Sequence, residues 1–394
     1  MALTIFIYSI LIFLIIILVL YVLSLKKKIR QNSSINNKNE PVIPELGWGV
    51  WFFLVLAIIL IIVSFFSPYL FTLPSIISSI GFDDTGEIGD TIGGLMNPFI
   101  AIAGVIVTGL AFYIQYKANQ IQQYQITRQN TDNEIQKFES QFYEMLRLHR
   151  ENVTEMKITG YDFEEKEGFR KFEKITEGRK VFVTMQTEFE SILASCSSQR
   201  KLDRENYQKC YDIFFSGLDD FAENFPEDDD LTGALEKLRI RHQNPEKRNI
   251  KFNDTRKKGY SDYNLNFNYK PFSGHASRLG HYFRHLYLTV KSIDDNEIIK
   301  GYEDKMKYLR ILRAQLSNHE QVLLFYNWLG SGGGNWENDK HSFFTDYKMI
   351  HNLPVNNLFS SEFIDKQLNH LRSKKPKHRL GRMFEIDELN QLEK

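Results

Sequence analysis

The chain has 394 residues, with 49 basic and 49 acidic side chains and therefore no formal net charge. This balance gives no support for nucleic acid or for a strongly acidic molecule as the partner. The charges are unevenly distributed, because only five basic and six acidic residues precede Lys117. The C-terminal two thirds therefore has the composition of an ordinary soluble domain, and it is long enough to enclose a large hydrophobic core.

The two cysteines bear on the compartment of that domain. Cys196 and Cys210 have neither the spacing of metal ligands nor the number needed for a disulfide framework. Two free thiols fit a reducing compartment. We expect no bound cofactor and no metal ion.

Three apolar segments are long enough to cross about 30 Å of hydrocarbon. Leu3–Leu25 and Trp48–Ile76 contain no charged residue, and Gly94–Tyr116 is interrupted only near its start. A cleaved signal peptide is the alternative for the first segment, but no basic region precedes it and no small-residue cleavage site follows it. The sequence therefore predicts three transmembrane helices within residues 1–116.

The loops between these segments predict an orientation. Lys26–Gly47 carries all five basic residues of this region, whereas Gly81–Asp90 carries only acidic ones. Because basic loops stay in the cytoplasm, the N-terminus is expected outside and the domain after the third helix inside. The free cysteines favour the same compartment.

The third predicted membrane helix contains more small and polar residues than a passive anchor needs. These are Asn97, Gly104, Thr108 and Gly109. Small residues four positions apart let helix backbones approach closely, and an asparagine can bond across helices or line a polar path. Packing of the three helices on one another, assembly of several chains, and a pore are the interpretations left open.

A long stalk helix is expected over residues 117–155, because neither Pro nor Gly occurs between Tyr113 and Val153. Largely apolar residues in its second half recur every three or four positions: Ile135, Phe138, Phe142, Met145 and His149. This period predicts a face that packs on the following domain or on a partner helix.

The remaining chain is expected to be a mostly α-helical cytoplasmic domain, since strand signals are scarce. We divide it into a helical subdomain (156–240), a polar linker, loop or small hairpin (241–270), a helical core (271–358) and a charged peripheral tail (359–394).

Within these regions the pattern predicts several individual elements. They are a charged connecting stretch at Gly160–Gly178, an amphipathic helix at Arg179–Cys196, a run at Asn206–Phe225, a helix at Leu231–Ile240, a helix at Leu279–Ile293, one long helix at Tyr302–Leu329 and a further helix at 343–353. The acids Glu227–Asp230 read as an N-cap cluster. A metal or nuclease carboxylate set is the alternative, although no Glu-x-Lys strand follows.

The glycine-rich segment Gly330–Gly334 is not a phosphate loop, because it follows a helix and no Gly-Lys-Ser/Thr ends it. It predicts a helix stop. His281 and His285 are four residues apart, so both could face one metal ion. The alternatives are a polar helix face that also contains Arg284, and a catalytic or anion-binding cluster of the three.

Arg313, Ser317 and Glu320 fall on one stripe of the predicted helix Tyr302–Leu329. An internal ion pair and hydrogen-bond set is the expected role, with Arg284 and Arg313 both partly buried. Arg313 and His319 also have the Arg-x(4–6)-His spacing of HEPN ribonucleases. A continuous helix would separate these two by about 120°, so they would converge only in a dimer or at a helix irregularity.

Three strings carry a resemblance to a known family. Gly280–Tyr287 reads Gly-His-Tyr-Phe-Arg-His-Leu-Tyr, Leu309–Ser317 reads Leu-Arg-Ile-Leu-Arg-Ala-Gln-Leu-Ser, and Leu324–Asn327 follows. Together with Phe138–Leu146 they resemble phage abortive-infection proteins of the AbiC type, over residues 97–354. The resemblance implies a bacterial defence protein that halts phage propagation, usually at the expense of the infected cell, and the apolar segments then place it in the bacterial cytoplasmic membrane. It supplies no reaction, and His319 is not part of the family pattern.

We therefore expect a membrane-anchored anti-phage protein whose cytoplasmic domain senses or binds a phage or host component. The lipid bilayer, further copies of the chain and an unidentified protein are the expected partners. A membrane-tethered ribonuclease of HEPN type and an interaction scaffold without a defence role are the alternatives, so the question of an enzyme stays open. The candidate binding residues are His281, Arg284, His285, Arg313, Ser317 and Glu320. The candidate catalytic residues are His281, Arg284, His285, Arg313 and His319.

The basic loop makes the orientation testable. A reporter that is active only in the cytoplasm should be active when fused to the C-terminus and inactive when fused to the N-terminus, because the positive-inside rule places the two ends on opposite sides. A second reporter that is active only outside should give the reverse pattern. A C-terminal fusion that is active outside would overturn both the orientation and the compartment inferred from the cysteines.

Overall fold

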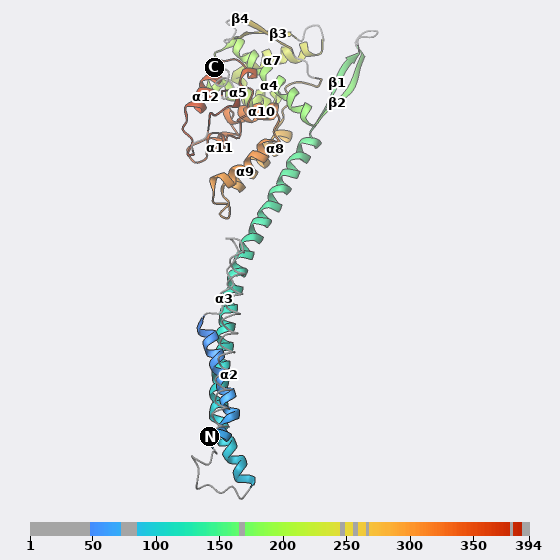
Figure 1. Ribbon diagram of the computed structural model, residues 1–394. Helices are drawn as coiled ribbons and strands as arrows, with labels where there is room; N and C mark the ends of the chain where they lie inside the picture. Colours follow the sequence, from blue (N-terminus) through green and yellow to red (C-terminus); the bar gives the residue numbers. More distant parts are fainter. Residues whose placement is uncertain are drawn as a thin grey trace. The chain divides into compact units, whose positions relative to one another are not determined.

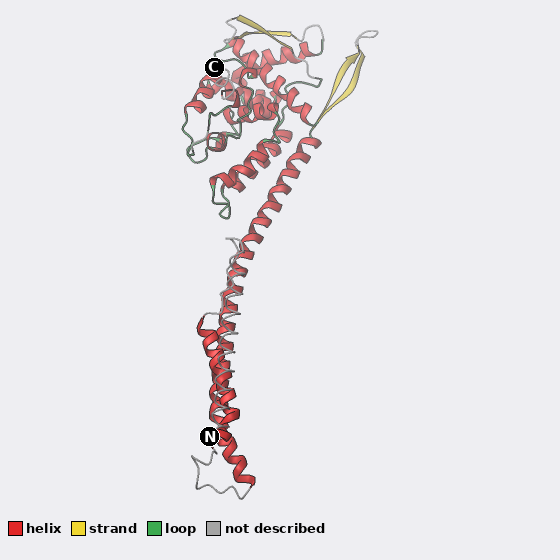
Figure 2. Cartoon of the chain, viewed as in Figure 1, coloured by secondary structure: helices red, strands yellow, loops and turns green. Residues whose placement is uncertain are grey.

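The computed structural model describes residues 48–71, 85–164, 170–244, 249–254, 259–264, 268–378 and 381–387. The chain divides into two compact units, Met1–Asn133 (unit 1) and Glu134–Lys394 (unit 2). The described residues are mostly helical, as the sequence predicts (Figure 2). The predicted helix Leu3–Leu25 and the basic loop after it lie outside the described residues.

Unit 1 contains α2 (Trp48–Phe71) and the first part of α3 (Thr85–Glu155), which lie side by side (Figure 1). Small side chains allow their close approach. Ser64 Oγ donates to the carbonyl of Met96 at 3.3 Å, and Ala57 and Ala103 are buried. Because α3 already begins at Thr85, the end of the acidic segment expected as a loop is helical.

Apolar side chains point outward along both helices of unit 1. Phe65 exposes 72% of its surface and Val105 exposes 74%. Such a surface is unfavourable in water and is solvated well by hydrocarbon. Two helices are long and apolar enough to cross a membrane, at Gly49–Pro68 and within Gly89–Glu155. In the latter, the uncharged part is the predicted segment Gly94–Tyr116. The described residues thus show two candidate spans of the three predicted.

Unit 2 is built from the end of α3, nine further helices among its described residues, and two hairpins. The helices are α4 (Arg179–Gln199), α5 (Arg204–Ser216), α6 (Leu218–Asn224), α7 (Asp229–His242), α8 (Ala276–Asp294), α9 (Tyr302–Arg313), α10 (Asn318–Leu329), α11 (Phe343–Tyr347) and α12 (Glu362–Ser373). One continuous hydrophobic cluster joins them, which makes unit 2 a single core.

The end of α3 is part of this core. Phe138 and Phe142 are buried, and the ring of Tyr308 on α9 packs edge-on against both at 5.1 and 5.2 Å between centroids. The Tyr308 hydroxyl also donates to Glu139 at 2.8 Å. The apolar seam read from the sequence is therefore the face by which α3 packs on α9.

Two antiparallel hairpins interrupt the helices. β1 (Lys157–Glu164) pairs with β2 (Arg170–Glu177), and β3 (Asn249–Asp254) pairs with β4 (Gly259–Asn264). The first pair occupies much of Gly160–Gly178, for which the sequence predicts only a charged connecting stretch. The second agrees with the hairpin that the sequence left open within residues 241–270.

Helix α4 is the centre of unit 2 and contacts α5, α7, α10 and β3. The apolar face predicted for it is buried, but so are several polar residues on its other faces: Gln186, Glu188, Glu190, Ser191 and Ser195. The amphipathic pattern is confirmed in the first half of α4, where Lys180 and Val183 are exposed, but the second half is more enclosed than predicted. The polar side chains that are buried there must be satisfied by partners inside the protein.

Two predicted continuous helices are each broken in the structure. Asn206–Phe225 is divided at Gly217, whose φ of 111° lies in the region that favours glycine. Tyr302–Leu329 is divided between Arg313 and Ser317. There Ser317 is extended and forms a capping box with Glu320, so a new helix starts. The predicted stripe of Arg313, Ser317 and Glu320 along one helix does not exist.

The acids before α7 also differ from the prediction. Asp228 stands at the N-cap position but makes no capping bond. It accepts a hydrogen bond from Arg200 and forms an ion pair with Lys209, each at 2.9 Å. Burial by itself would raise the pKa of Asp228, but these two cations outweigh burial and lower it. Asp228 therefore links α4, α5 and α7 rather than capping a helix.

The C-terminal tail is not peripheral. α12 buries Ile364, Leu368 and Leu371, and Phe384 beyond it is fully buried. The helix predicted at 343–353 is shorter than expected, because α11 ends where Lys348 adopts the left-handed conformation. Residues after Ser360 complete the core, and the expectation of a charged tail on the surface is corrected.

The glycine-rich turn after α10 provides a matched test of packing. An alanine Cβ at Gly333 would collide with the carbonyl of Asn327, whereas at Gly334 it would meet no atom within 4 Å. Gly333→Ala should lower the free energy of unfolding by about 2 kcal/mol, and Gly334→Ala should change it by less than about 0.5 kcal/mol. Chemical denaturation of the two variants measures both. Equal stabilities would contradict the packing described here.

Candidate functional site

Three of the predicted site residues lie on α8, and they do not form one cluster with a common partner. His281 and Arg284 are exposed, and Arg284 pairs with no side chain among the described residues. The predicted internal ion pair of Arg284 is therefore wrong. His285 is half-buried, and its ring stacks on that of His149 from α3 at 6.2 Å between centroids.

Glu320 on α10 is the polar centre of this region. Its carboxylate is fully buried and accepts from the Tyr282 hydroxyl of α8 at 3.0 Å and from the Ser317 amide at 2.7 Å. The guanidinium of Arg179, at the start of α4, lies 3.7 Å away. Ser317 and Glu320 are thus neighbours as predicted, but through a capping box. Their cationic partner is Arg179 instead of Arg313.

His319 contacts the middle of α4. Its Nδ1 lies 2.6 Å from the amide oxygen of Gln186, whose nitrogen donates to Glu190 at 2.8 Å. The Tyr326 hydroxyl donates to the same carboxylate at 2.9 Å. Burial lowers the pKa of His319. This chain of hydrogen bonds fixes α10 on α4.

The ribonuclease pattern is divided between two helices. Arg313 ends α9 and donates to the carbonyl of Lys348 at 3.1 Å, whereas His319 begins α10 and contacts Gln186. The two side chains therefore bond to different elements. The pair His281 and His285 gains no third ligand either, because no group of three or more His, Cys, Asp and Glu side chains in the described ranges could hold a metal ion.

A groove lies beside the turn that joins α9 to α10. Its volume is about 510 Å³, and Arg310, Arg313 and Gln321 are on its walls. The other lining residues are Ala314, Leu316, Asn318, Asn352, Leu353, Pro354, Glu385 and Ile386. Gln321 is 1% exposed, and its side-chain oxygen has no hydrogen-bond donor among the described residues. A buried amide in that state is stabilised when a ligand donates to it.

Sequence reasoning found one of these groove residues and missed the others. Arg313 was a candidate, and Arg310 lies one turn before it on the same face of α9. That spacing is a signal that could have found Arg310. Gln321 carries no such signal, because an amide on a helix is usually a solvated residue.

The small and polar residues of α3 in unit 1 face outward. Asn97, Gly104 and Thr108 are exposed, and an added Cβ at Gly104 or Gly109 would meet no atom within 4 Å. Thr108 donates to the carbonyl of Gly104 at 2.8 Å. Asn97, Gly104 and Thr108 are therefore not used to pack α3 on the described part of α2, whereas Gly109 borders the cavity between the two helices.

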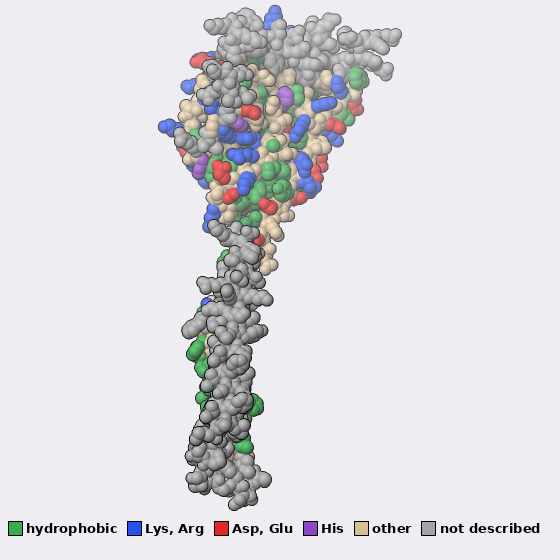
Figure 3. Space-filling view, viewed as in Figure 1, with side chains coloured by type: hydrophobic (Ala, Val, Ile, Leu, Met, Phe, Trp, Pro, Cys, Tyr) green, Lys and Arg blue, Asp and Glu red, His purple; other side chains and the backbone are tan. Residues whose placement is uncertain are grey.

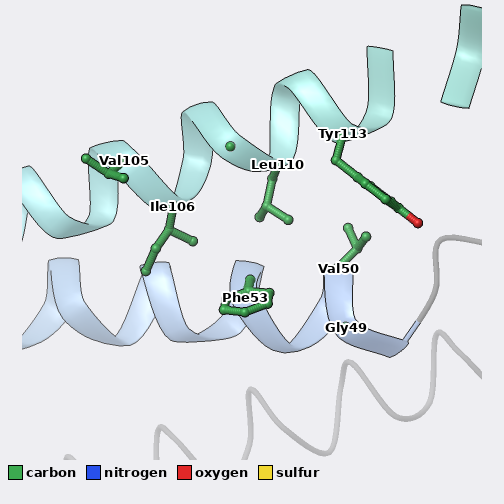
Figure 4. A pocket seen from close by; sticks show the side chains of 8 residues that line it. Gly49, Val50, Phe53, Val105, Ile106, Leu110 and Tyr113 are labelled. Atoms are coloured by element: carbon green, nitrogen blue, oxygen red, sulfur yellow. The ribbon is translucent and has the colours of Figure 1, made fainter. Parts of the chain in front are cut away.

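A cavity of about 490 Å³ lies between α2 and α3 (Figure 4). Phe53 of α2 and Leu110 of α3 point into the same space, and the remaining lining residues are Gly49, Val50, Val105, Ile106, Gly109 and Tyr113. Asn97 is not among them. Apart from the Tyr113 hydroxyl the lining side chains are apolar, unlike the polar lining of an ion path.

Comparison with known proteins gave one match. Residues 274–358 match the model of a family described as "Putative phage abortive infection protein". The predicted resemblance is thereby confirmed over this segment, which contains α8, α9, α10 and α11. The string Phe138–Leu146 lies outside the matched residues. Searches of curated proteins and of solved structures found no match.

The histidine that stacks on His285 predicts a sensitivity to acid. Burial, and repulsion by His285 and Arg179, lower the pKa of His149 to about 4. This part of α3 is polar and lies beyond the uncharged segment Gly94–Tyr116. Between about pH 6.5 and 4 the unfolded chain binds a proton that the folded chain does not. The contribution of neutral His149 to the free energy of unfolding is therefore fully present above pH 6.5 and is lost as the pH falls.

We expect His149→Phe to remove this contribution, which amounts to about 3 kcal/mol over the full range. The measurement is thermal denaturation of the full-length protein in detergent at pH 7 and pH 5. The variant should lose less stability than wild type on acidification, whereas the same substitution at exposed His281 should leave the loss unchanged. An identical loss in wild type and His149→Phe would show that His149 is not buried in its neutral form.

Proposed function

We propose that this chain is a membrane-anchored phage-defence protein whose unit 2 binds a phage or host component in the groove beside the α9–α10 turn. The match of residues 274–358 to the abortive-infection family carries this proposal. The same segment supplies most of the groove, from Arg310 to Pro354. A role in phage defence follows from the family, and the position of the binding site is inferred from the geometry.

The apolar surface of unit 1 supports the membrane anchor. Two helices are long and apolar enough to span a bilayer, and they expose large side chains such as Phe65 and Val105. The distribution of basic residues, argued above, favours an outside N-terminus and a cytoplasmic unit 2. A protein that must act while phage components are being made inside the cell would need its binding unit in that compartment.

The chemistry of the groove favours a protein segment as the occupant. Leu316, Leu353 and Pro354 provide apolar contact, while Arg310 and Gln321 provide a cation and an unpartnered amide oxygen. A peptide backbone offers both N–H donors and carbonyl acceptors for such a mixed wall. Figure 3 shows basic and acidic side chains interspersed on the visible face of unit 2, without the basic stripe that nucleic-acid binding produces.

The groove can be tested with two cations on one helix. Arg310 lines the groove and is exposed, whereas Lys307, one turn earlier, does not line it and pairs with Asp304. Loss of a charge-assisted hydrogen bond to the occupant costs about 1.5 kcal/mol or more, which is about a tenfold loss of affinity. Arg310→Gln should therefore reduce protection against phage by about tenfold, and Lys307→Gln should not.

The measurement is phage plating on a sensitive host that carries wild type, either variant or no gene, at matched protein levels. Full protection by Arg310→Gln would remove the groove from the proposal and leave the defence role standing. If wild type plates every phage as efficiently as the host without the gene, the defence role itself fails. Cleavage of RNA by the purified full-length protein would favour the ribonuclease instead.

A further inference from the structure

A second cavity, of about 270 Å³, lies at the junction of α3, α4 and the α9–α10 turn. The last turns of α3 contribute His149, Arg150 and Thr154, the start of α4 contributes Gly178 and Arg179, and the turn contributes Gln315. All of these residues belong to unit 2. The groove proposed above shares none of these lining residues, so the two sites can be tested separately.

His149 is the first indication that this cavity holds a ligand. Its side chain is 1% exposed, and neither ring nitrogen has a hydrogen-bond partner in the described structure. Its neighbours are the rings of Tyr282 and His285, at 5.3 and 6.2 Å between centroids. Leaving a buried N–H unpaired costs about 1–3 kcal/mol, and an acceptor in the cavity would offset that cost.

The second indication is the positive electrostatic character of the walls. Helix α4 begins at Arg179 on the cavity wall, and no described side chain caps it. The Val181 amide donates to the Gly178 carbonyl, which leaves the amides of Arg179 and Lys180 as the first ones for a ligand. The first amides of a helix of this length are a favourable site for an anion. Arg150 is exposed on the cavity wall and pairs with no described carboxylate.

One cation of the cavity wall, Arg179, already has an acidic neighbour, Glu320. Arg179 donates to the carbonyl of Gln315 at 2.8 Å and lies 3.7 Å from Glu320. Glu320 also accepts from Tyr282 and from the Ser317 amide. The charge of Glu320 is therefore shared among Arg179 and two donors outside the cavity, whereas Arg150 on the cavity wall has no carboxylate partner among the described residues.

We infer that this cavity binds the phosphate group of a small molecule, with Arg150, Arg179 and the start of α4 around the oxyanion and His149 as a neutral donor. Arginines and helix N-termini are the groups that proteins use for phosphate. The cavity exceeds the space that one phosphate group occupies, so either inorganic phosphate or a phosphate monoester such as a nucleotide is accommodated. This site is separate from the proposed groove and is formed mainly by residues of α3 and α4.

The experiment uses full-length protein in detergent and measures binding of inorganic phosphate, AMP and ATP by calorimetry at constant ionic strength. Wild type should bind at least one of the three, and comparison of the arms separates free phosphate from a nucleotide. His149→Phe and Arg150→Gln should each weaken binding about tenfold or more. His149→Phe removes no hydrogen bond from the folded protein, and Arg150 is exposed, so both variants are expected to fold.

Arg147→Gln is the matched control, because Arg147 lies on the same helix, is exposed and pairs with Glu144 outside the cavity. It should bind like wild type. Absence of binding by wild type to all three probes would overturn the inference, and so would equal binding by wild type, His149→Phe and Arg150→Gln. Neither result depends on phage plating, so this inference and the proposed function fail independently.

Discussion

Burying a carboxylate costs several kcal/mol unless donors replace the lost water, and unit 2 buries three on its central helices. Glu188 accepts from Tyr269, the Phe272 amide and His275. Glu190 accepts from Gln186 and Tyr326, and Glu320 from Tyr282 and Ser317. Each set of donors comes partly from an element distant in sequence. The carboxylates therefore fix which helices may neighbour α4 and α10, while the hydrophobic cluster supplies the bulk of the favourable burial.

The turn between α9 and α10 contributes residues to both proposed sites and is held by one of these buried carboxylates. Gln315 lies on the wall of the smaller cavity, and Leu316 lies on the wall of the groove. The capping box that starts α10 holds both in place through Ser317 and Glu320. This short turn therefore lies between the two proposed sites: the groove, whose walls are both polar and apolar, and the smaller cavity, whose walls carry cationic side chains. Positions fixed in this way do not have to be ordered by the ligand, so binding there loses little conformational entropy.

Sequence patterns predicted the helical class, the apolar spans and the family segment, because these depend on local period and composition. The division of Tyr302–Leu329 could also have been found, since Ser317-Asn318-His319-Glu320 is a capping-box pattern. The β1–β2 hairpin could not, because Phe172 and Ile175 are three residues apart and both are exposed, unlike the alternation of a half-buried strand. The stacking of His149 on His285 could not be predicted either, because it depends on how α3 packs on α8 and no local sequence pattern in either segment indicates it.

Glu320 takes part in the capping of α10, in a bond from α8 and in a contact with the first residue of α4. One carboxylate offers only about four lone-pair directions, so its hydrogen-bond donors compete for the same acceptor sites. If Tyr282 or Arg179 is replaced, the remaining donors can form shorter bonds to Glu320. The loss in free energy of unfolding from replacing both residues would therefore differ from the sum of the two single losses. Substitutions in three separate helices are thereby coupled, and tolerance at any one of these positions depends on which residue occupies the others.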